Sequence, residues 1–430
     1  MLLLLAFLLL LQTGSGADWL TWRGPSETGM APGDAPLTWS VTENIAWKTD
    51  IPGRGHSSPV IAGDRLFLTT AVPASPEGVS REGRGASGGT GGAAAGVSHR
   101  FIVLCLDRNS GKVLWEKTAL TATPHEGYHY RYGSFASNSP VTDGKIIYAF
   151  FGSRGLYAYT VDGKSLWQKS FPPMRMRLGF GEGTAPVLHG NTLLLSFDQE
   201  DGSYLVALDK NNGKELWRVD RDEPSAWSPP LVVSYEGQKQ VITAATKRVR
   251  AYELETGKLI WECGGLGTNV IPAPVVAKNV LYVMSGHRDP NLMAIQLGRK
   301  GDLTGTNAVL WENKRANSYT PSPVLHENRL YFVSDNGLLS CLNASTGAVL
   351  YQERLPNPYN FKASPVGVNG KLYLSTEEGD VLVMKMGDKF EVLAINKMPD
   401  EIFIASPAVV DNSLYLRSQR SVFCVRSPRK

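Results

Sequence analysis

One short segment of the sequence has the residue types and spacing of a zinc-dependent hydrolase. Thr123–His129 reads T-P-H-E-G-Y-H and contains the pattern H-E-x-x-H. That pattern binds zinc in metalloproteases when a helix places both histidines on one face. Here Pro124 precedes the pattern and Gly127 lies inside it, and both residue types disfavour a helix. We therefore interpret the segment as a polar loop, with a zinc protease site or a structural or adventitious metal as the alternatives.

A glycine-rich segment, residues 73–99, is a second candidate for chemistry. Its centre, Ser87–Gly96, reads S-G-G-T-G-G-A-A-A-G. A phosphate-binding loop ends in Gly-Lys-Ser or Gly-Lys-Thr before a helix, and this run has no such ending. We expect a flexible insertion between two strands instead.

The composition excludes several classes of protein. The chain has 430 residues, of which 42% are hydrophobic and 20% charged, so it has enough apolar residues for a globular core. The net charge is only +4, from 44 basic and 40 acidic residues. This near balance argues against a nucleic acid partner.

The elements that would position any functional residue are repeats of one phrase. A small or polar residue, a proline and an apolar residue recur eight times, and from the second copy onward the spacing is 42 to 49 residues. A period near 40–45 residues with strand-like content is typical of a β-propeller blade. The repeated prolines are Pro59, Pro140, Pro186, Pro230, Pro274, Pro323, Pro365 and Pro407.

Each repeat is predicted to contain four strands. The phrase begins the first strand, and an apolar run such as Val280–Val283 forms the second. The third strand ends at a turn such as Asp209–Lys214, where Asp, Asn and Gly suit a tight reversal. The fourth strand carries an aromatic residue in six repeats, namely Trp115, Trp167, Trp217, Trp261, Trp311 and Tyr351.

The eighth repeat has only three strands after its proline, and the N-terminal segment Asn44–Lys48 supplies the missing one. Trp47 lies 12 residues before Pro59, the spacing that separates Trp311 from Pro323. We expect this strand to pair with Ser421–Val425 and close the ring, which removes an open sheet edge. The sequence thus predicts an all-β, eight-bladed β-propeller of four-stranded antiparallel blades, with residues 18–430 as one domain.

The N-terminus has the features of an export signal. Met1–Leu11 is an apolar run of the length of a signal-peptide core, and small residues at Ser15 and Ala17 fit cleavage before Asp18. We expect residues 1–17 to be a signal peptide, with an uncleaved anchor as the alternative. The predicted location is periplasmic or secreted, and no later segment is apolar enough to span a membrane.

The repeats, with turns of the type Asp-x-x-Ser/Asn-Gly-Lys followed by Leu-Trp, resemble the quinoprotein-type (PQQ-like) propeller repeat. The opening Trp19–Pro25, W-L-T-W-R-G-P, is similar to that of uncharacterised secreted bacterial members. More distantly, the resemblance extends to quinoprotein alcohol dehydrogenases and to the assembly lipoproteins of the BamB type. It implies pyrroloquinoline quinone (PQQ) as a possible cofactor. Quinoprotein dehydrogenases place an adjacent cysteine pair over PQQ and hold calcium with Glu, Asn and Asp, and this sequence has no adjacent cysteines.

The four cysteines are predicted to be unpaired. Cys105, Cys341 and Cys424 occupy the third-strand position at which other repeats have alanine. We interpret them as small buried side chains. No disulfide is therefore expected, Cys263 included, although the chain is expected to be exported.

The rim of the propeller is the predicted binding site. Loops from fourth to first strands and from second to third strands emerge on the same side and converge on the axis. Arginine and histidine in these loops favour an anionic or planar ligand at the mouth of the central channel. The candidate residues are His56, Arg131, Arg175, Arg177 and His287.

These patterns favour a monomeric binding or scaffold protein whose partner is a protein or a small anionic ligand. Neither a metal site nor a cofactor is assigned, and no residue is assigned to catalysis. The first alternative is a PQQ-dependent or sugar oxidoreductase, the reaction class expected if the protein is an enzyme. The second alternative is a BamB-like factor for the assembly of outer-membrane proteins.

Overall fold

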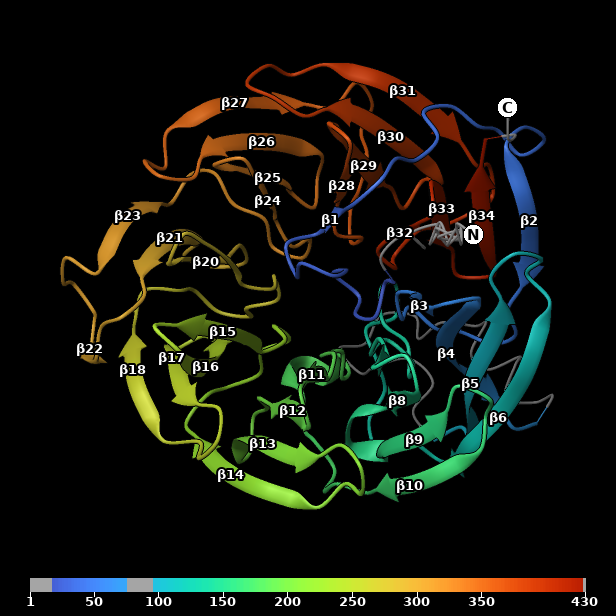
Figure 1. Ribbon diagram of the computed structural model, residues 1–430, viewed down its shortest axis with the longest axis horizontal. Helices are drawn as coiled ribbons and strands as arrows, with labels where there is room; N and C mark the ends of the chain where they lie inside the picture. The colour runs from blue at the N-terminus through green and yellow to red at the C-terminus, as the bar shows by residue number, and fades with distance from the viewer. Residues whose placement is uncertain (1–17, 76–95, 428–430) are drawn as a thin grey trace, which may run out of the picture.

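The computed structural model describes residues 18–75 and 96–427, which form eight β-sheets arranged in a ring around a central axis (Figure 1). Each sheet contains four antiparallel strands, and two sheets carry one additional parallel strand. In seven sheets the four strands follow the chain order from the axis outward, and in the eighth the outermost strand is the N-terminal β2. The predicted eight-bladed propeller is therefore confirmed. The predicted signal peptide and residues 76–95 of the predicted insertion lie outside the described residues.

We number the blades along the chain, and the strands of each are given from the axis outward. Blade 1 has β3 (Val60–Ala62), β4 (Arg65–Pro73), β5 (His99–Asp107) and β6 (Val113–Ala122), and blade 2 has β7 (Val141–Thr142), β8 (Ile146–Phe150), β9 (Leu156–Thr160) and β10 (Ser165–Lys169). Blade 3 has β11 (Val187–His189), β12 (Thr192–Phe197), β13 (Ser203–Asp209) and β14 (Glu215–Arg221), and blade 4 has β15 (Leu231–Tyr235), β16 (Gln238–Ala244), β17 (Val249–Glu253) and β18 (Leu259–Cys263), with β22 (Gly301–Asp302) added at its outer edge.

The second half of the ring repeats this order. Blade 5 has β19 (Val275–Ala277), β20 (Val280–Ser285), β21 (Asn291–Gln296) and β23 (Val309–Asn313), and blade 6 has β24 (Val324–His326), β25 (Arg329–Val333), β26 (Leu338–Asn343) and β27 (Val349–Arg354). Blade 7 has β28 (Val366–Val368), β29 (Lys371–Ser375), β30 (Asp380–Lys385) and β31 (Val392–Lys397), with β1 (Met30–Ala31) added on its axial side. Blade 8 has β32 (Ala408–Val410), β33 (Ser413–Arg417), β34 (Ser421–Arg426) and β2 (Ile45–Asp50). Two short 3-10 helices, η1 (Gly152–Arg154) and η2 (Arg177–Gly179), lie in the loops of blade 2 and before blade 3.

The ring closes as predicted from the sequence. Strand β2 pairs antiparallel with β34, with Ile45 opposite Val425 and Asp50 opposite Ser421. Figure 1 shows the blue β2 beside the red β34 at the junction of the two chain ends. The N-terminal strand therefore completes blade 8.

The recurring Trp and Gly residues join neighbouring blades. The Trp47 indole Nε1 donates to the Arg108 carbonyl of the next blade at 2.9 Å, and Trp217 does the same to Leu254 at 2.9 Å. Gly111, in the turn that follows Arg108, has a φ of +73°, and a Cβ there would lie 2.5 Å from the Trp47 ring. Glycine is needed at this turn both for its backbone conformation and for the space that the indole fills.

The four cysteines are free and buried, as predicted. Cys105, Cys341 and Cys424 lie in the third strands β5, β26 and β34. Cys263 lies in the fourth strand β18. Burial raises the pKa of Cys105 to about 11, which is expected of a thiol that serves as packing.

Candidate functional site

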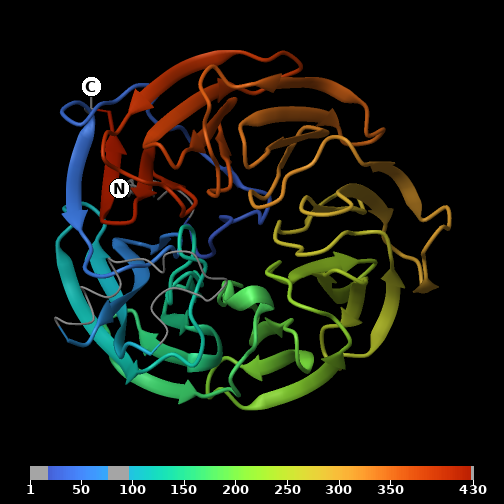
Figure 2. The same cartoon turned by 180° about the vertical axis from the view of Figure 1, so that it is seen from behind.

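The N-terminal arm, residues 18–43, crosses one end of the central channel. Trp19 exchanges backbone hydrogen bonds with blade 1, and β1 pairs with β28 of blade 7. Between them, the buried Arg23 donates to the carbonyls of Pro323 at 2.6 Å and Pro365 at 2.9 Å. Figure 1 shows the blue arm passing over the middle of the ring, and the view from behind in Figure 2 has the inter-blade loops in front of it.

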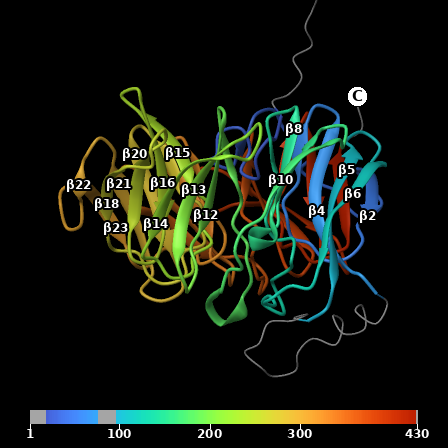
Figure 3. The same ribbon diagram turned by 90° about the horizontal axis from the view of Figure 1, so that it is seen from below.

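A cavity of about 440 Å³ occupies the channel above this arm. Trp22 of the arm lines it, so the arm closes the cavity on one side. All eight loops between a fourth strand and the next first strand contribute at least one lining residue. Figure 3 shows the ring from the side, so that its two ends can be told apart: the arm approaches the axis from one end and the inter-blade loops from the other. The predicted convergence of the inter-blade loops is therefore observed.

One half of the cavity wall, which we call the aromatic half, comes from the loops before blades 3, 4 and 5 and the start of the loop that follows blade 5. Phe180, Trp227, Ile271 and Tyr319 line it, and the Trp227 indole donates to the carbonyl of Gly181 at 2.8 Å. That hydrogen bond satisfies the indole N–H within the protein. The Trp227 ring therefore offers an apolar surface to the cavity.

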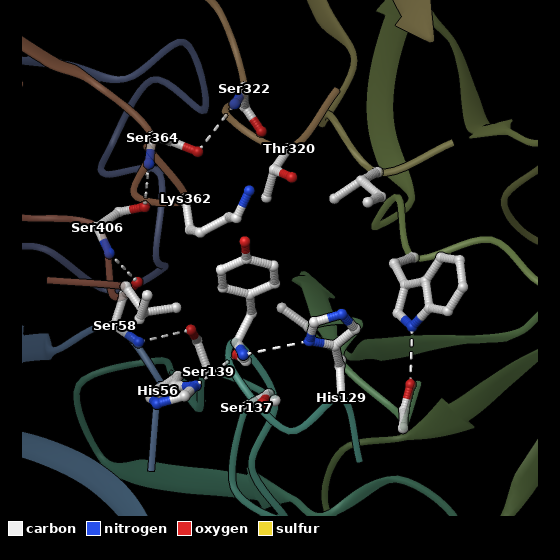
Figure 4. Close-up of a pocket in the computed structure, with 18 of the residues that line it drawn as sticks. His56, Ser58, His129, Ser137, Ser139, Thr320, Ser322, Lys362, Ser364 and Ser406 are labelled. Carbon is white, nitrogen blue, oxygen red and sulfur yellow. Dashed lines mark hydrogen bonds between the residues drawn. The ribbon is translucent and has the colours of Figure 1, made fainter. Parts of the chain in front are cut away.

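The other half of the wall, the serine half, comes from blades 6, 7, 8, 1 and 2. A serine precedes the repeated proline in each of these blades, and all five serines are buried and line the cavity. Each hydroxyl accepts a backbone N–H from the preceding blade at 2.9 Å. Figure 4 shows those of these hydrogen bonds that join one serine to the next. These serines are Ser322, Ser364, Ser406, Ser58 and Ser139.

The charged groups at the cavity are largely paired with each other. Lys362 lies against Asp335 and 4.0 Å from Glu377, and it contacts the face of the Tyr132 ring at 4.2 Å. Arg131 also pairs with Glu377, at 3.2 Å. Despite these cations, burial raises the pKa of the Glu377 carboxyl.

Three histidines line the cavity, and each is held neutral near pH 7. Burial, followed by Arg54 and Arg417, lowers the pKa of His56 well below its usual value. Burial, followed by Lys362, likewise lowers the pKa of His129. His287 stacks on Tyr319 with ring centroids 5.0 Å apart, and its pKa is lowered by burial and Arg288. Neutral imidazoles offer one hydrogen-bond donor and one acceptor each.

The five residues predicted for the site fall into two groups. His56 and His287 line the cavity, and Arg131 lies beside it, 5.3 Å from the ring centroid of the lining residue Tyr132. Arg175 is exposed and Arg177 is half-buried, and neither belongs to the cavity lining. Their backbone N–H groups are held by Gln199 and Ser225 in the loops of blade 3.

The H-E-x-x-H segment is a loop between β6 and β7, as the sequence indicated. Its two histidines have different surroundings. His125 Nε2 lies 2.6 Å from the Met174 carbonyl, whereas His129 lines the cavity between Tyr132 and Phe180. The segment contributes an aromatic wall residue rather than two histidines on one helical face.

Two parts of the site were not predicted from the sequence. The arm was not assigned to the channel end, although its two closely spaced tryptophans and Arg23 are unusual for an extended linker. The row of five hydrogen-bonded serines in the serine half was not recognised either. Its signal was already present in the repeated phrase, where Ser stands before proline in five of eight copies.

The chain matches known proteins over most of its length. The family model described as "Outer membrane protein assembly factor BamB" matches residues 99–307 and 302–397, more than two thirds of the sequence. BamB of Yersinia pestis is 26% identical over 344 residues, which cover 75% of this chain and 79% of that protein. Polyvinylalcohol dehydrogenase of a Pseudomonas species is 24% identical over 291 residues, 58% of this chain and 39% of that protein.

Solved structures share the fold at lower identity. BamB of Moraxella catarrhalis has a TM-score of 0.55 at 14% identity, covering 76% of this chain and 93% of that one. Quinohemoprotein alcohol dehydrogenase of Comamonas testosteroni has a TM-score of 0.65 at 10% identity, covering 96% and 81%. These structures support the propeller architecture, and the match to the family model is the more specific finding. The chain therefore belongs to the PQQ-like propeller family described as outer membrane protein assembly factor BamB.

Proposed function

We propose that this protein is an exported binding protein that holds a small molecule in its central cavity. The cavity carries the proposal, because its volume of about 440 Å³ lies within the range of small-molecule sites. The arm and Trp22 close one side, so a ligand would enter between the inter-blade loops. Aromatic rings on one half of the wall and hydroxyls on the other would bind an amphipathic molecule.

The proposed location outside the cytoplasm rests on the apolar N-terminal segment. No helix among the described residues is long and apolar enough to cross a membrane. We propose a periplasmic or secreted monomer, in which the open mouth of the cavity faces the solvent.

Native mass spectrometry of protein purified from its source organism tests this proposal. Gly183→Leu is the blocking variant, since a Cβ at Gly183 would lie 3.4 Å from Trp227 and 3.8 Å from Ser137 at the cavity wall. Gly264→Leu is the matched control, because its Cβ would also have ordinary contacts and Gly264 does not line the cavity. We expect a retained ligand in the parent protein and in Gly264→Leu, and none in Gly183→Leu. A ligand retained by both variants would place it elsewhere and contradict the proposal.

A second candidate function is assembly of outer-membrane proteins, which is favoured by the match to the BamB family model and to the Yersinia pestis protein. A scaffold of this kind would bind another protein and would need no ligand in the cavity. Deleting its gene should then lower the amounts of outer-membrane proteins. Restoring the Gly183→Leu variant should reverse that loss as well as the parent does.

A quinoprotein dehydrogenase is the alternative that the cavity residues fit least well. None of the four cysteines lines the cavity. Glu182 is the one carboxylate in the described lining, and its oxygens accept from Ser153 N, Ser153 Oγ and Arg154 Nη1. A calcium ion would have to displace these donors. PQQ added to the purified protein provides the direct check, and we expect no stoichiometric binding.

A further inference from the structure

The hydroxyls of the serine half have an unused hydrogen-bonding capacity. In each of the five inter-blade bonds the backbone nitrogen is the donor, so the serine Oγ is the acceptor. A hydroxyl that accepts still has its own hydrogen to donate. Within the described residues, none of these five hydroxyls donates to a protein acceptor, and all five line the cavity. The serine half therefore presents a row of O–H donors to whatever fills the cavity.

His56 adds an acceptor beside this row. Its Nδ1 lies 2.8 Å from the carbonyl oxygen of Tyr132, and because a carbonyl can only accept, Nδ1 carries the proton. The lone pair of the neutral ring is then on Nε2. Nε2 is buried without a partner among the described residues, in a side chain that is only 6% exposed and lines the cavity. A buried acceptor of this kind costs free energy unless a donor reaches it.

A buried cation lies behind this half of the wall, next to His56. Arg417 is fully buried and donates to the carbonyls of Ser57 and Thr69, each at 2.7 Å. No carboxylate in the described part of the chain pairs with it. Burial lowers the pKa of Arg417 to about 9, so it keeps its charge at neutral pH. The other cavity charges, Lys362 and Glu182, are already paired.

We propose that the serine half and His56 recognise a small hydroxylated carboxylate. Its carboxylate oxygens would accept from the serine hydroxyls, and a neighbouring hydroxyl would donate to His56 Nε2. Its carbon skeleton would pack against the rings of the aromatic half. This inference rests on the proposed small-molecule function and names the chemical class of the ligand.

Three six-carbon probes separate the parts of this proposal in a calorimetric titration. D-gluconate carries both a carboxylate and hydroxyls, D-sorbitol carries only hydroxyls, and hexanoate carries only the carboxylate. We expect gluconate to bind at least about tenfold more tightly than sorbitol or hexanoate. Each of these two lacks one kind of group, which leaves buried donors or an acceptor of the protein unpaired. Equal affinity for sorbitol or hexanoate would overturn the proposal.

Substitutions in the cavity wall test which protein groups bind the ligand. His56→Asn keeps an amide N–H near the position of Nδ1 and lacks Nε2, so gluconate binding should weaken about tenfold. Ser406→Ala should weaken it similarly, and Ser406→Thr should restore it because the hydroxyl returns. Ser228→Ala is the matched control: its hydroxyl bridges blades to the Pro272 carbonyl at 2.9 Å and does not line the cavity. Unchanged binding in His56→Asn and Ser406→Ala would overturn the proposal.

Failure of this inference is distinguishable from failure of the proposed function. If gluconate does not bind, while Gly183→Leu expels some other retained ligand, the hydroxylated-carboxylate class is wrong and the cavity function stands. If no ligand is retained and no probe binds, both are wrong.

Discussion

The two halves of the cavity wall are built from the corresponding inter-blade loops of the same repeat, yet they differ in chemistry. Before the repeated proline, blades 6, 7, 8, 1 and 2 have serine, whereas blades 3, 4 and 5 have Ala185, Pro229 and Ala273. Where serine is present, a hydroxyl joins adjacent blades and faces the cavity. Where it is absent, bulky rings such as Trp227 fill the wall. One repeated backbone frame thus forms a polar and an apolar surface around a single axis.

The halves also join their blades differently. In the serine half a backbone N–H meets the next serine hydroxyl at a constant 2.9 Å. Between blades 2 and 3 and between blades 4 and 5, side chains donate to carbonyls instead: Asn138 Nδ2 to Thr184 at 2.6 Å, and Ser228 Oγ to Pro272 at 2.9 Å. The serine half therefore has a regular row of hydrogen bonds, whereas the aromatic half depends on individual contacts.

The largest expected difference concerns two buried arginines behind the cavity wall, one in the blades of each half. Arg221 links blades 3 and 4 and pairs with the buried Asp198 at 2.8 Å. Arg417 links blades 8 and 1 through carbonyl oxygens. Arg221→Met should lower the free energy of unfolding by about 3–5 kcal/mol, because it leaves the buried carboxylate of Asp198 unpaired. Arg417→Met should cost only about 1–3 kcal/mol, because neutral acceptors remain.

Urea unfolding of both variants checks this prediction. Adding Asp198→Leu to Arg221→Met should recover part of the loss, since the unpaired charge is then gone. An Arg417→Met cost as large as that of Arg221→Met would mean that the serine half depends on its buried cation as strongly as the aromatic half depends on its ion pair.

A smaller effect should follow from breaking the serine row. Ser364→Ala removes the acceptor of the Ser322 N–H, and a buried donor left unsatisfied costs about 1–2 kcal/mol. Ser228→Ala in the aromatic half should cost a similar amount, because it strands the Pro272 carbonyl. Thermal unfolding by calorimetry measures both. A loss several times larger for Ser364→Ala would show that the row acts cooperatively.

The fold could be predicted from the sequence because the repeated residues are the ones that form the strands, the turns and the contacts between blades. The spacing of the prolines and the Trp–Gly turns determine strand number and blade contact, and Trp47 identified the closing strand. The cavity chemistry was harder to predict. Arg175 and Arg177 lie in an inter-blade loop as expected, but the direction of a loop side chain depends on packing that spacing does not encode. The arm was missed because it has no repeat to be compared with.

A stabilising change should extend the serine half by one blade. Within the described residues the Ser139 N–H has no acceptor in blade 3, where Ala185 stands at the position of the next serine. Ala185→Ser should supply one and raise the free energy of unfolding by about 0.5–1 kcal/mol. The measurement is urea unfolding, with Ala185→Val as a control that adds bulk without a hydroxyl. Destabilisation by both variants would mean that blades 2 and 3 are too close for the row to continue.

The smallest effect is expected at the outer rim of the aromatic half. Arg175→Ala combined with Arg177→Ala should leave the melting temperature within about 1 °C, because charges in solvent-accessible loops without a described ion pair contribute little to stability. Since neither side chain lines the cavity, gluconate affinity should fall by no more than about threefold, through lost electrostatic steering that added salt would also suppress. Calorimetric titration at two salt concentrations measures this. A larger loss that persists at high salt would mean that the ligand contacts this rim directly, and would move the anionic subsite from the serine half to the aromatic half.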